Sequence, residues 1–271
     1  MRKVFWVWIV LFFYFEGHAQ ADSDRKIFYP SSVAWAKVEA NEIFDNKVGV
    51  GLDYVHRTKN ILGQGTMFDT HARSSIRPWV HYQFGTNARA SVSPIGYFIT
   101  NDHVATEADL NRPEYHEWRT TFQYFHHHKQ LNGRLMHTWR YRYELRWQEQ
   151  PRFDNYRFFT RFRFRYRIRY VLNQEDFYEN NALYGMISNE IGLNIGRNVV
   201  MNTFNQNRLY VGLGYRFFNS ARVELRYVDR LRTRGATGFE MDLEKGFMVG
   251  LYIDQISNLG RRKIEGVRFA D

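Results

Sequence analysis

The sequence predicts an all-β protein, a transmembrane antiparallel up-and-down β-barrel. Three observations lead to this fold class. The N-terminus resembles a leader, apolar and polar residues alternate along most of the chain, and no later apolar stretch is long enough for a membrane-spanning helix. Short alternating segments of about ten residues are typical of strands that cross a membrane. The expected strand count is twelve, with ten as the alternative.

The composition narrows the class of protein before any motif is considered. Of the 271 residues, 44% are hydrophobic and 18% aromatic, so the chain is expected to fold rather than stay disordered. The sequence has no cysteine, which excludes disulfides, thiol catalysis and cysteine-bound metals. The net charge of +10 points to nucleic acid, anionic lipid or an acidic solute as a partner.

Residues 1–21 are predicted to be a cleaved secretory signal peptide. Two basic residues precede an apolar run from Val4 to Phe15, and small residues at Ala19 and Ala21 complete a cleavage-like ending. A membrane anchor is the alternative interpretation, although the run is short for a spanning helix.

Export sets the expected location and partners. The barrel is predicted over residues 22–257, and a basic C-terminal tail over residues 258–271. The expected location is the outer membrane of a Gram-negative bacterium, with outer-membrane lipid as a partner and small anionic solutes as a candidate partner. Nucleic acid is not expected as a partner of an exported protein, no cofactor is predicted, and the oligomeric state stays open.

Eleven segments show the alternation of strands. A period of two residues places alternate side chains on opposite faces of a strand. One set is apolar and rich in aromatic residues, whereas the other set contains Arg, Glu, Asp and Gly. In chain order the segments are 34–40, 48–54, 76–84, 88–100, 117–124, 138–147, 157–170, 183–193, 208–217, 222–227 and 239–254.

A twelfth strand is expected because single-chain bacterial barrels use even strand numbers. The only segment left before Ala34 is Arg25–Ser32, in which Pro30 restricts a strand to an edge or a kink. Most breaks between the segments alternate between short and long, as expected for periplasmic turns and outer loops.

The polar face of these segments is predicted to line the lumen. In Arg157–Tyr170 nearly every second residue is arginine, which is too charged for a dry core. An arginine that faced the middle of the bilayer would cost about 2–4 kcal/mol. The alternative is a soluble, lipocalin-like barrel with the apolar face inward. The predicted basic lumen residues are Arg140, Arg142, Arg146, Arg157, Arg161, Arg163, Arg165, Arg167, Arg169, Arg208, Arg216, Arg222 and Arg226. The predicted acidic counter-charges are Glu144, Glu190, Glu224, Glu240, Asp242 and Glu244.

The opposite face is predicted to carry aromatic residues at the lipid interface, whereas Trp35 and Trp79 fall on the inward register. Lys245 interrupts the outward register of the last segment. This predicts either a bulge near Gly246, or a snorkelling lysine with Phe239–Glu244 outside the bilayer. The predicted interface residues are Trp118, Trp139, Trp147, Tyr166 and Tyr170.

The segment from Phe204 to Leu231, FNQNRLYVGLGYRFFNSARVELRYVDRL, resembles a bacterial outer-membrane family described as domain of unknown function 2490. The pieces YRYELRW and FRFRYRIRY upstream add to the resemblance. The resemblance implies a β-barrel in the outer membrane of a Gram-negative cell and carries no catalytic residues. The sequence departs from many such barrels because it continues to Phe269-Ala270-Asp271 instead of ending on an aromatic residue.

No enzyme and no metal site are predicted from the residues. His126, His127 and His128 are consecutive, so in a strand they point to opposite faces and do not converge easily on a metal. Ser188 and Asn189 resemble part of an outer-membrane phospholipase motif, but Ser188 lacks the histidine two residues before it. Ser93 has no evident partner that could act as a base.

Two functions remain open on the sequence. The first is a channel or binding barrel that prefers anions because arginine lines its lumen. The alternative is a structural barrel whose lumen is closed by its own Arg–Glu/Asp network. An outer-membrane lipid-modifying enzyme is a third, less favoured class.

Overall fold

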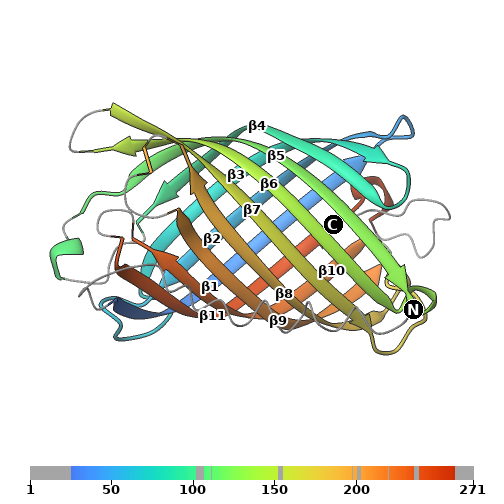
Figure 1. Ribbon diagram of the computed structural model, residues 1–271. Coiled ribbons are helices and arrows are strands. Elements are labelled where there is room, and N and C mark those ends of the chain that lie inside the picture. Colours follow the sequence, from blue (N-terminus) through green and yellow to red (C-terminus); the bar gives the residue numbers. More distant parts are fainter. Residues whose placement is uncertain are drawn as a thin grey trace, which may run out of the picture.

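Eleven strands close into one barrel in the computed structural model of the chain (Figure 1). The structure describes residues 26–101, 107–110, 112–151, 155–196, 198–199, 203–218, 220–234 and 238–259. The predicted signal peptide and residues 260–271 of the predicted tail lie outside this description. The strands are β1 (Ile27–Ile43), β2 (Val48–Lys59), β3 (Thr70–Phe84), β4 (Ala88–Thr100), β5 (Tyr115–Gln130), β6 (Leu135–Gln150), β7 (Asn155–Val171), β8 (Ala182–Ile195), β9 (Phe204–Phe218), β10 (Ala221–Thr233) and β11 (Glu240–Ile253). Three short 3-10 helices, η1 (Glu107–Asp109), η2 (Leu131–Gly133) and η3 (Ile256–Asn258), lie between or after them.

The strand counts of twelve and ten are wrong, because the two predicted segments before Ile43 form a single strand. Pro30 does not break β1, which pairs in continuous register from Ile27 to Ala40 with β11. Consecutive strands are antiparallel, so an odd number leaves the first and last strands running in the same direction. The barrel accordingly closes through a parallel β1–β11 pair, whereas the other strand pairs are antiparallel.

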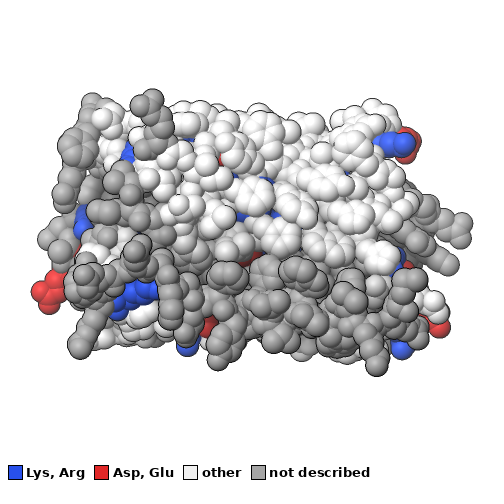
Figure 2. Space-filling view, viewed as in Figure 1, with Lys and Arg blue, Asp and Glu red and all other residues white. Residues whose placement is uncertain are grey.

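The outer face of the barrel is apolar. Alternate residues on the strands are exposed and include many Leu, Val, Ile, Phe and Tyr side chains, with Leu213 and Leu225 more than half exposed. Figure 2 shows charged side chains gathered at the two ends, while the visible middle band is mainly uncharged. Among the helices of the described chain, none has the length and apolar character needed to cross a membrane.

The tryptophans divide between the two faces as their register requires. Trp35 and Trp79 are buried inside the barrel. Trp118 and Trp147 are cross-strand partners on the exposed face of β5 and β6, near the end of the barrel that carries the β2–β3 and β4–β5 connections, here called the long-loop end. Trp139 lies on the same face toward the other end, where it stacks on His126 and His137 and packs at a tilt against Tyr166. Tyr170 is also exposed.

Lys245 sits in an unbroken strand. The register of β11 runs through Lys245 and Gly246 without a shift against both β1 and β10, so the predicted bulge is wrong. The Lys245 side chain is exposed on the outer face, five residues from the start of β11, opposite Asp229. The position of this lysine relative to a bilayer stays a prediction.

Candidate functional site

The interior of the barrel is lined by arginines. On β7, Arg161, Arg163, Arg165, Arg167 and Arg169 are all buried, because the period of two puts them on the concave face. Of the thirteen basic residues predicted for the lumen, twelve are buried. Arg157 is the exception: its side chain is exposed at the rim and donates to the backbone oxygen of Asn198.

The acidic residues follow the same division. Glu144, Glu190, Glu224, Asp242 and Glu244 are buried inside. Glu240 differs, because it is only partly buried as the first residue of β11, where it accepts a 3.1 Å hydrogen bond from the Tyr29 hydroxyl.

The interior also contains charged residues that were not predicted from the sequence. The arginines on β3 to β5 share the inward register but are spaced too widely along the sequence to stand out. Arg230 and Arg232 were not selected because the predicted segment 222–227 ends before them, whereas β10 continues to Thr233. The additional buried residues are Arg73, Arg77, Arg89, Arg119, Arg230, Arg232 and Arg234, with the acids Asp53, Glu117, Asp109 and Asp254.

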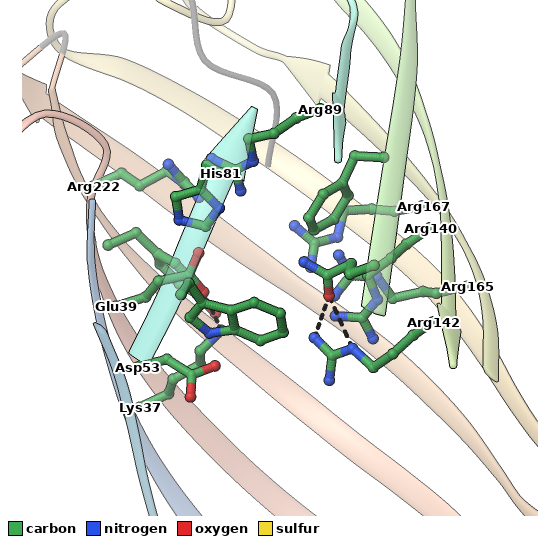
Figure 3. Close-up of a pocket in the computed structure, with 14 residues that line it drawn as sticks. Lys37, Glu39, Asp53, His81, Arg89, Arg140, Arg142, Arg165, Arg167 and Arg222 are labelled. Atoms are coloured by element: carbon green, nitrogen blue, oxygen red, sulfur yellow. Dashed lines mark hydrogen bonds and ion pairs between the residues drawn. The ribbon is translucent and has the colours of Figure 1, made fainter. Parts of the chain in front are cut away.

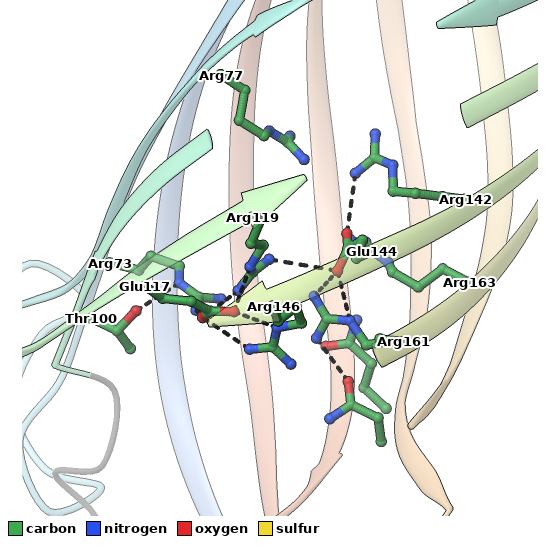
Figure 4. A network of polar contacts seen from close by, with 12 residues as sticks. Arg73, Arg77, Thr100, Glu117, Arg119, Arg142, Glu144, Arg146, Arg161 and Arg163 are labelled. Atoms are coloured by element: carbon green, nitrogen blue, oxygen red, sulfur yellow. Dashed lines mark hydrogen bonds and ion pairs between the residues drawn. The ribbon is translucent and has the colours of Figure 1, made fainter. Parts of the chain in front are cut away.

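Two carboxylates hold one half of the arginine network together (Figure 4). Glu144 on β6 accepts hydrogen bonds from Arg161 at 2.8 Å and Arg163 at 3.0 Å, and its oxygens lie 3.7 Å from Arg119. Glu117 on β5 accepts from Arg119 at 2.7 Å, from Arg146 at 2.9 Å and from Arg73 at 3.3 Å. Each carboxylate is fully buried and serves at least three guanidinium groups.

The remaining carboxylates also have arginine partners. Glu190 accepts from Arg140 and Arg163 and lies 3.4 Å from Arg208. Asp53 accepts a bidentate pair of bonds from Arg77, at 2.8 and 2.6 Å. Further ion pairs join Arg216 and Arg222 to Asp254, Arg222 and Arg226 to Glu224, Arg230 to Glu244, Arg232 and Arg234 to Asp242, and Arg234 to Asp109.

Positive charge exceeds negative charge inside the barrel. Among the described residues, twenty buried side chains are Arg or Lys and nine are Asp or Glu, an excess of eleven positive charges. Arg165 makes no hydrogen bond and no ion pair within 4.0 Å with any residue that the structure describes, and its Nε is buried. Arg57 rests on the ring of Trp35, 4.0 Å from the ring centroid, and its buried Nε has no hydrogen-bond partner.

Two adjoining cavities lie in this interior. Their volumes are about 30 and about 80 Å³, and both are lined by Lys37, Arg140, Arg142 and Arg165. Of the described residues around the larger cavity, eleven are arginines, and Glu190 is the single carboxylate. Figure 3 shows Arg140, Arg142, Arg165 and Arg167 on one wall of the smaller cavity, with residues such as Asp53 and His81 opposite. This space suits water molecules and small ions rather than a large solute.

The model of a family described as Protein of unknown function (DUF2490) matches residues 33–241. The chain belongs to this family. The match runs from the middle of β1 to the start of β11, so it covers almost the whole DUF2490 barrel and confirms the resemblance to domain of unknown function 2490. No curated protein and no solved structure matches the chain.

The histidine run of this DUF2490 chain lies on the last residues of β5, with His127 buried inside and His126 and His128 exposed outside. Within the part of the chain that is described, no three His, Asp or Glu residues are placed to hold a metal ion.

Proposed function

We propose that this chain is an outer-membrane β-barrel whose interior binds and passes small inorganic anions. The observation that carries the proposal is the larger cavity, whose lining, among the described residues, has eleven arginines and a single carboxylate. Positive side chains that line a narrow, low-dielectric passage attract anions and exclude cations. The cavity volumes of about 30 and about 80 Å³ favour an ion of the size of chloride over an organic solute.

A location in the outer membrane accounts for the distribution of side chains on the two faces. The exposed apolar side chains would contact lipid, and Trp118, Trp147 and Trp139 would lie at the two interfaces. A barrel in water would instead expose its arginines and bury its aromatic face, because unpaired charge is costly to bury.

Leu213→Arg tests the lipid contact. Leu213 is 56% exposed on the outer face of β9, so in phospholipid vesicles its replacement by arginine is expected to lower the free energy of unfolding by about 2–4 kcal/mol. Leu172→Arg is the matched control, because Leu172 is also exposed but follows the end of β7. The measurement is urea unfolding of both variants in vesicles. Equal, small losses for the two variants would contradict lipid contact at Leu213.

A closed structural barrel is the second candidate function. It is favoured by the pairing of Arg161 and Arg163 with Glu144, and of Arg163 with Glu190, because paired side chains fill the lumen. The excess positive charge favours the anion pathway, since a network built only for closure needs no more arginines than its acids can neutralise.

Ion selectivity in a planar bilayer separates the two candidates. Under a KCl gradient, the wild-type protein is expected to give a reversal potential with the same sign as the equilibrium potential of chloride. Arg165→Glu should move this potential toward the potassium value, because Arg165 lines both cavities and has no ion-pair partner among the described residues. The shift should shrink in high salt, where charges are screened.

Arg157→Glu is the matched charge reversal, since Arg157 is exposed at the rim. It should leave the reversal potential close to wild type. Cation preference in the wild type, or a potential that Arg165→Glu does not move, would reject the anion pathway. A folded, inserted protein without conductance would instead support the closed barrel.

A further inference from the structure

A serine, a histidine and a carboxylate lie in a row on the outside of the barrel, at its long-loop end. The Ser74 Oγ is 3.0 Å from Nε2 of His71. The Nδ1 of His71 is 2.8 Å from Oε1 of Glu114, which lies just before β5. Hydrolases that work through an acyl-enzyme use this arrangement. A nucleophile lies within hydrogen-bond distance of a base, and a third group orients the base.

A β-bulge brings this histidine and serine to one face. Three residues apart in a regular strand, His71 and Ser74 would point to opposite sides. Arg57 of β2 pairs with Arg73 while the next residue, Thr58, pairs with His71, so Ala72 is the extra residue of a bulge. Bulges re-aim side chains and are common beside active sites. Regular alternation would place His71 and Ser74 on opposite faces, so the sequence pattern does not predict their contact.

The hydrogen bonds around Ser74 fit one assignment of protons. Glu114 accepts a bond from Nδ1–H of His71, which leaves the lone pair of Nε2 to accept the Ser74 hydroxyl proton. The Nδ1 of His56, 2.9 Å from Ser74 Oγ, then carries a hydrogen and donates it to that oxygen. His71 is thus the base, and the N–H of His56 is a donor beside the reacting oxygen.

The site lies where an ester-linked lipid would present its carbonyl group. Ser75, the next residue, lines the larger cavity inside, so Ser74 faces outward. Ile76, two residues further along β3 on the same face, is exposed and pairs with Tyr97, whose ring packs at a tilt against Trp118. Amphipathic aromatic rings favour the membrane–water interface, and lipid esters lie at the same depth. The side chains of His71 and Glu114 are 28% and 46% exposed, so water reaches them.

We propose that Ser74, His71 and Glu114 form a hydrolytic site that cleaves acyl esters of membrane lipids. The Ser74 Oγ attacks the ester carbonyl carbon while its proton passes to His71 Nε2. The bond from this carbon to the alcohol oxygen of the lipid breaks, and the alcohol leaves with the proton from Nε2. Water then attacks the acyl group, giving a proton to Nε2. The bond to Oγ breaks, Ser74 regains the proton, and a fatty acid leaves.

His56 and Glu114 have separate assignments in this site. The His56 N–H lies 2.9 Å from Ser74 Oγ, and we assign it to the oxyanion that forms next to this atom when Oγ bonds to the carbonyl carbon. Glu114 is a positioning residue, because it contacts His71 and not the reacting atoms. Its loss should therefore lower kcat while leaving KM for the lipid unchanged.

The test uses the full chain in mixed micelles of detergent and diacyl phosphatidylcholine, with released fatty acid as the readout. The wild type is expected to release fatty acid, Ser74→Ala to lose about 10³-fold or more, and Glu114→Gln to lose about tenfold in kcat alone. An alkyl fluorophosphonate should label Ser74, as located by peptide mass spectrometry.

Ser91→Ala is the matched control. Ser91 also contacts a histidine, 2.8 Å from Nδ1 of His81, but it is buried inside the barrel away from lipid. Ser91→Ala should retain full release. Release by Ser74→Ala at the wild-type rate, labelling at another serine, or no release by the folded wild type would overturn the proposal. Cleavage of a water-soluble short-chain ester without cleavage of phosphatidylcholine would reject the lipid as substrate class.

Discussion

Replacing Glu144 with glutamine is expected to destabilise the barrel by about 3–5 kcal/mol. The Glu144 carboxylate is fully buried and accepts hydrogen bonds from Arg161 and Arg163, with Arg119 3.7 Å away. Glutamine keeps the shape but removes the negative charge, so these guanidinium groups lose their shared counter-charge. Arg163 keeps Glu190 and Arg119 keeps Glu117, but Arg161 has no second carboxylate within 4.0 Å among the described residues, in an interior that holds eleven more positive than negative buried groups.

Urea unfolding in detergent measures this loss, with Glu179→Gln as the control. Glu179 is exposed in the turn after β7, and its side chain makes no hydrogen bond or ion pair with the described residues, so its variant should stay within about 0.5 kcal/mol of wild type. A loss for Glu144→Gln below about 1 kcal/mol would mean that water screens the lumen arginines well enough to replace the carboxylate.

The alternation of the strands made most of the fold and much of the arginine-lined interior predictable. The ladder on β7 is the clearest case, because a period of two fixes the face of every residue from Arg161 to Arg169. The strand count was not predictable in this way. Pro30 looked like a break, yet it lies within β1 in register with Leu243 of the parallel strand.

The ion-pair partners were also beyond the sequence. Arg77 meets Asp53, and Arg73 meets Glu117, because of the relative shift between neighbouring strands. Alternation gives the face of a residue but not its height relative to the next strand. The pairing of His71 with Ser74 depends on the bulge at Ala72, where alternation itself fails.

Gly246→Ala is expected to weaken the closure of the barrel. Gly246 of β11 is the register partner of Val33 in β1, in the parallel pair that joins the two ends of the sheet. A methyl group at this glycine would overlap the backbone oxygen of Val33. Backbone atoms cannot move aside as a flexible side chain does, so β1 and β11 would have to separate. We expect a loss of about 3 kcal/mol, at the upper end of the cost of overpacking.

Gly185→Ala is the matched control for the substitution in the parallel β1–β11 pair. Gly185 also lies within a strand, β8, but a methyl group there would have no heavy atom within 4 Å outside its own chain neighbours. Its variant should therefore unfold in urea at nearly the wild-type concentration, while Gly246→Ala should unfold at a clearly lower one. Closure of the barrel removes the two free edges of the sheet. Separation of β1 from β11 would therefore also expose unpaired strands and promote aggregation. Equal midpoints for the two variants would show that the parallel β1–β11 pair does not hold the barrel closed.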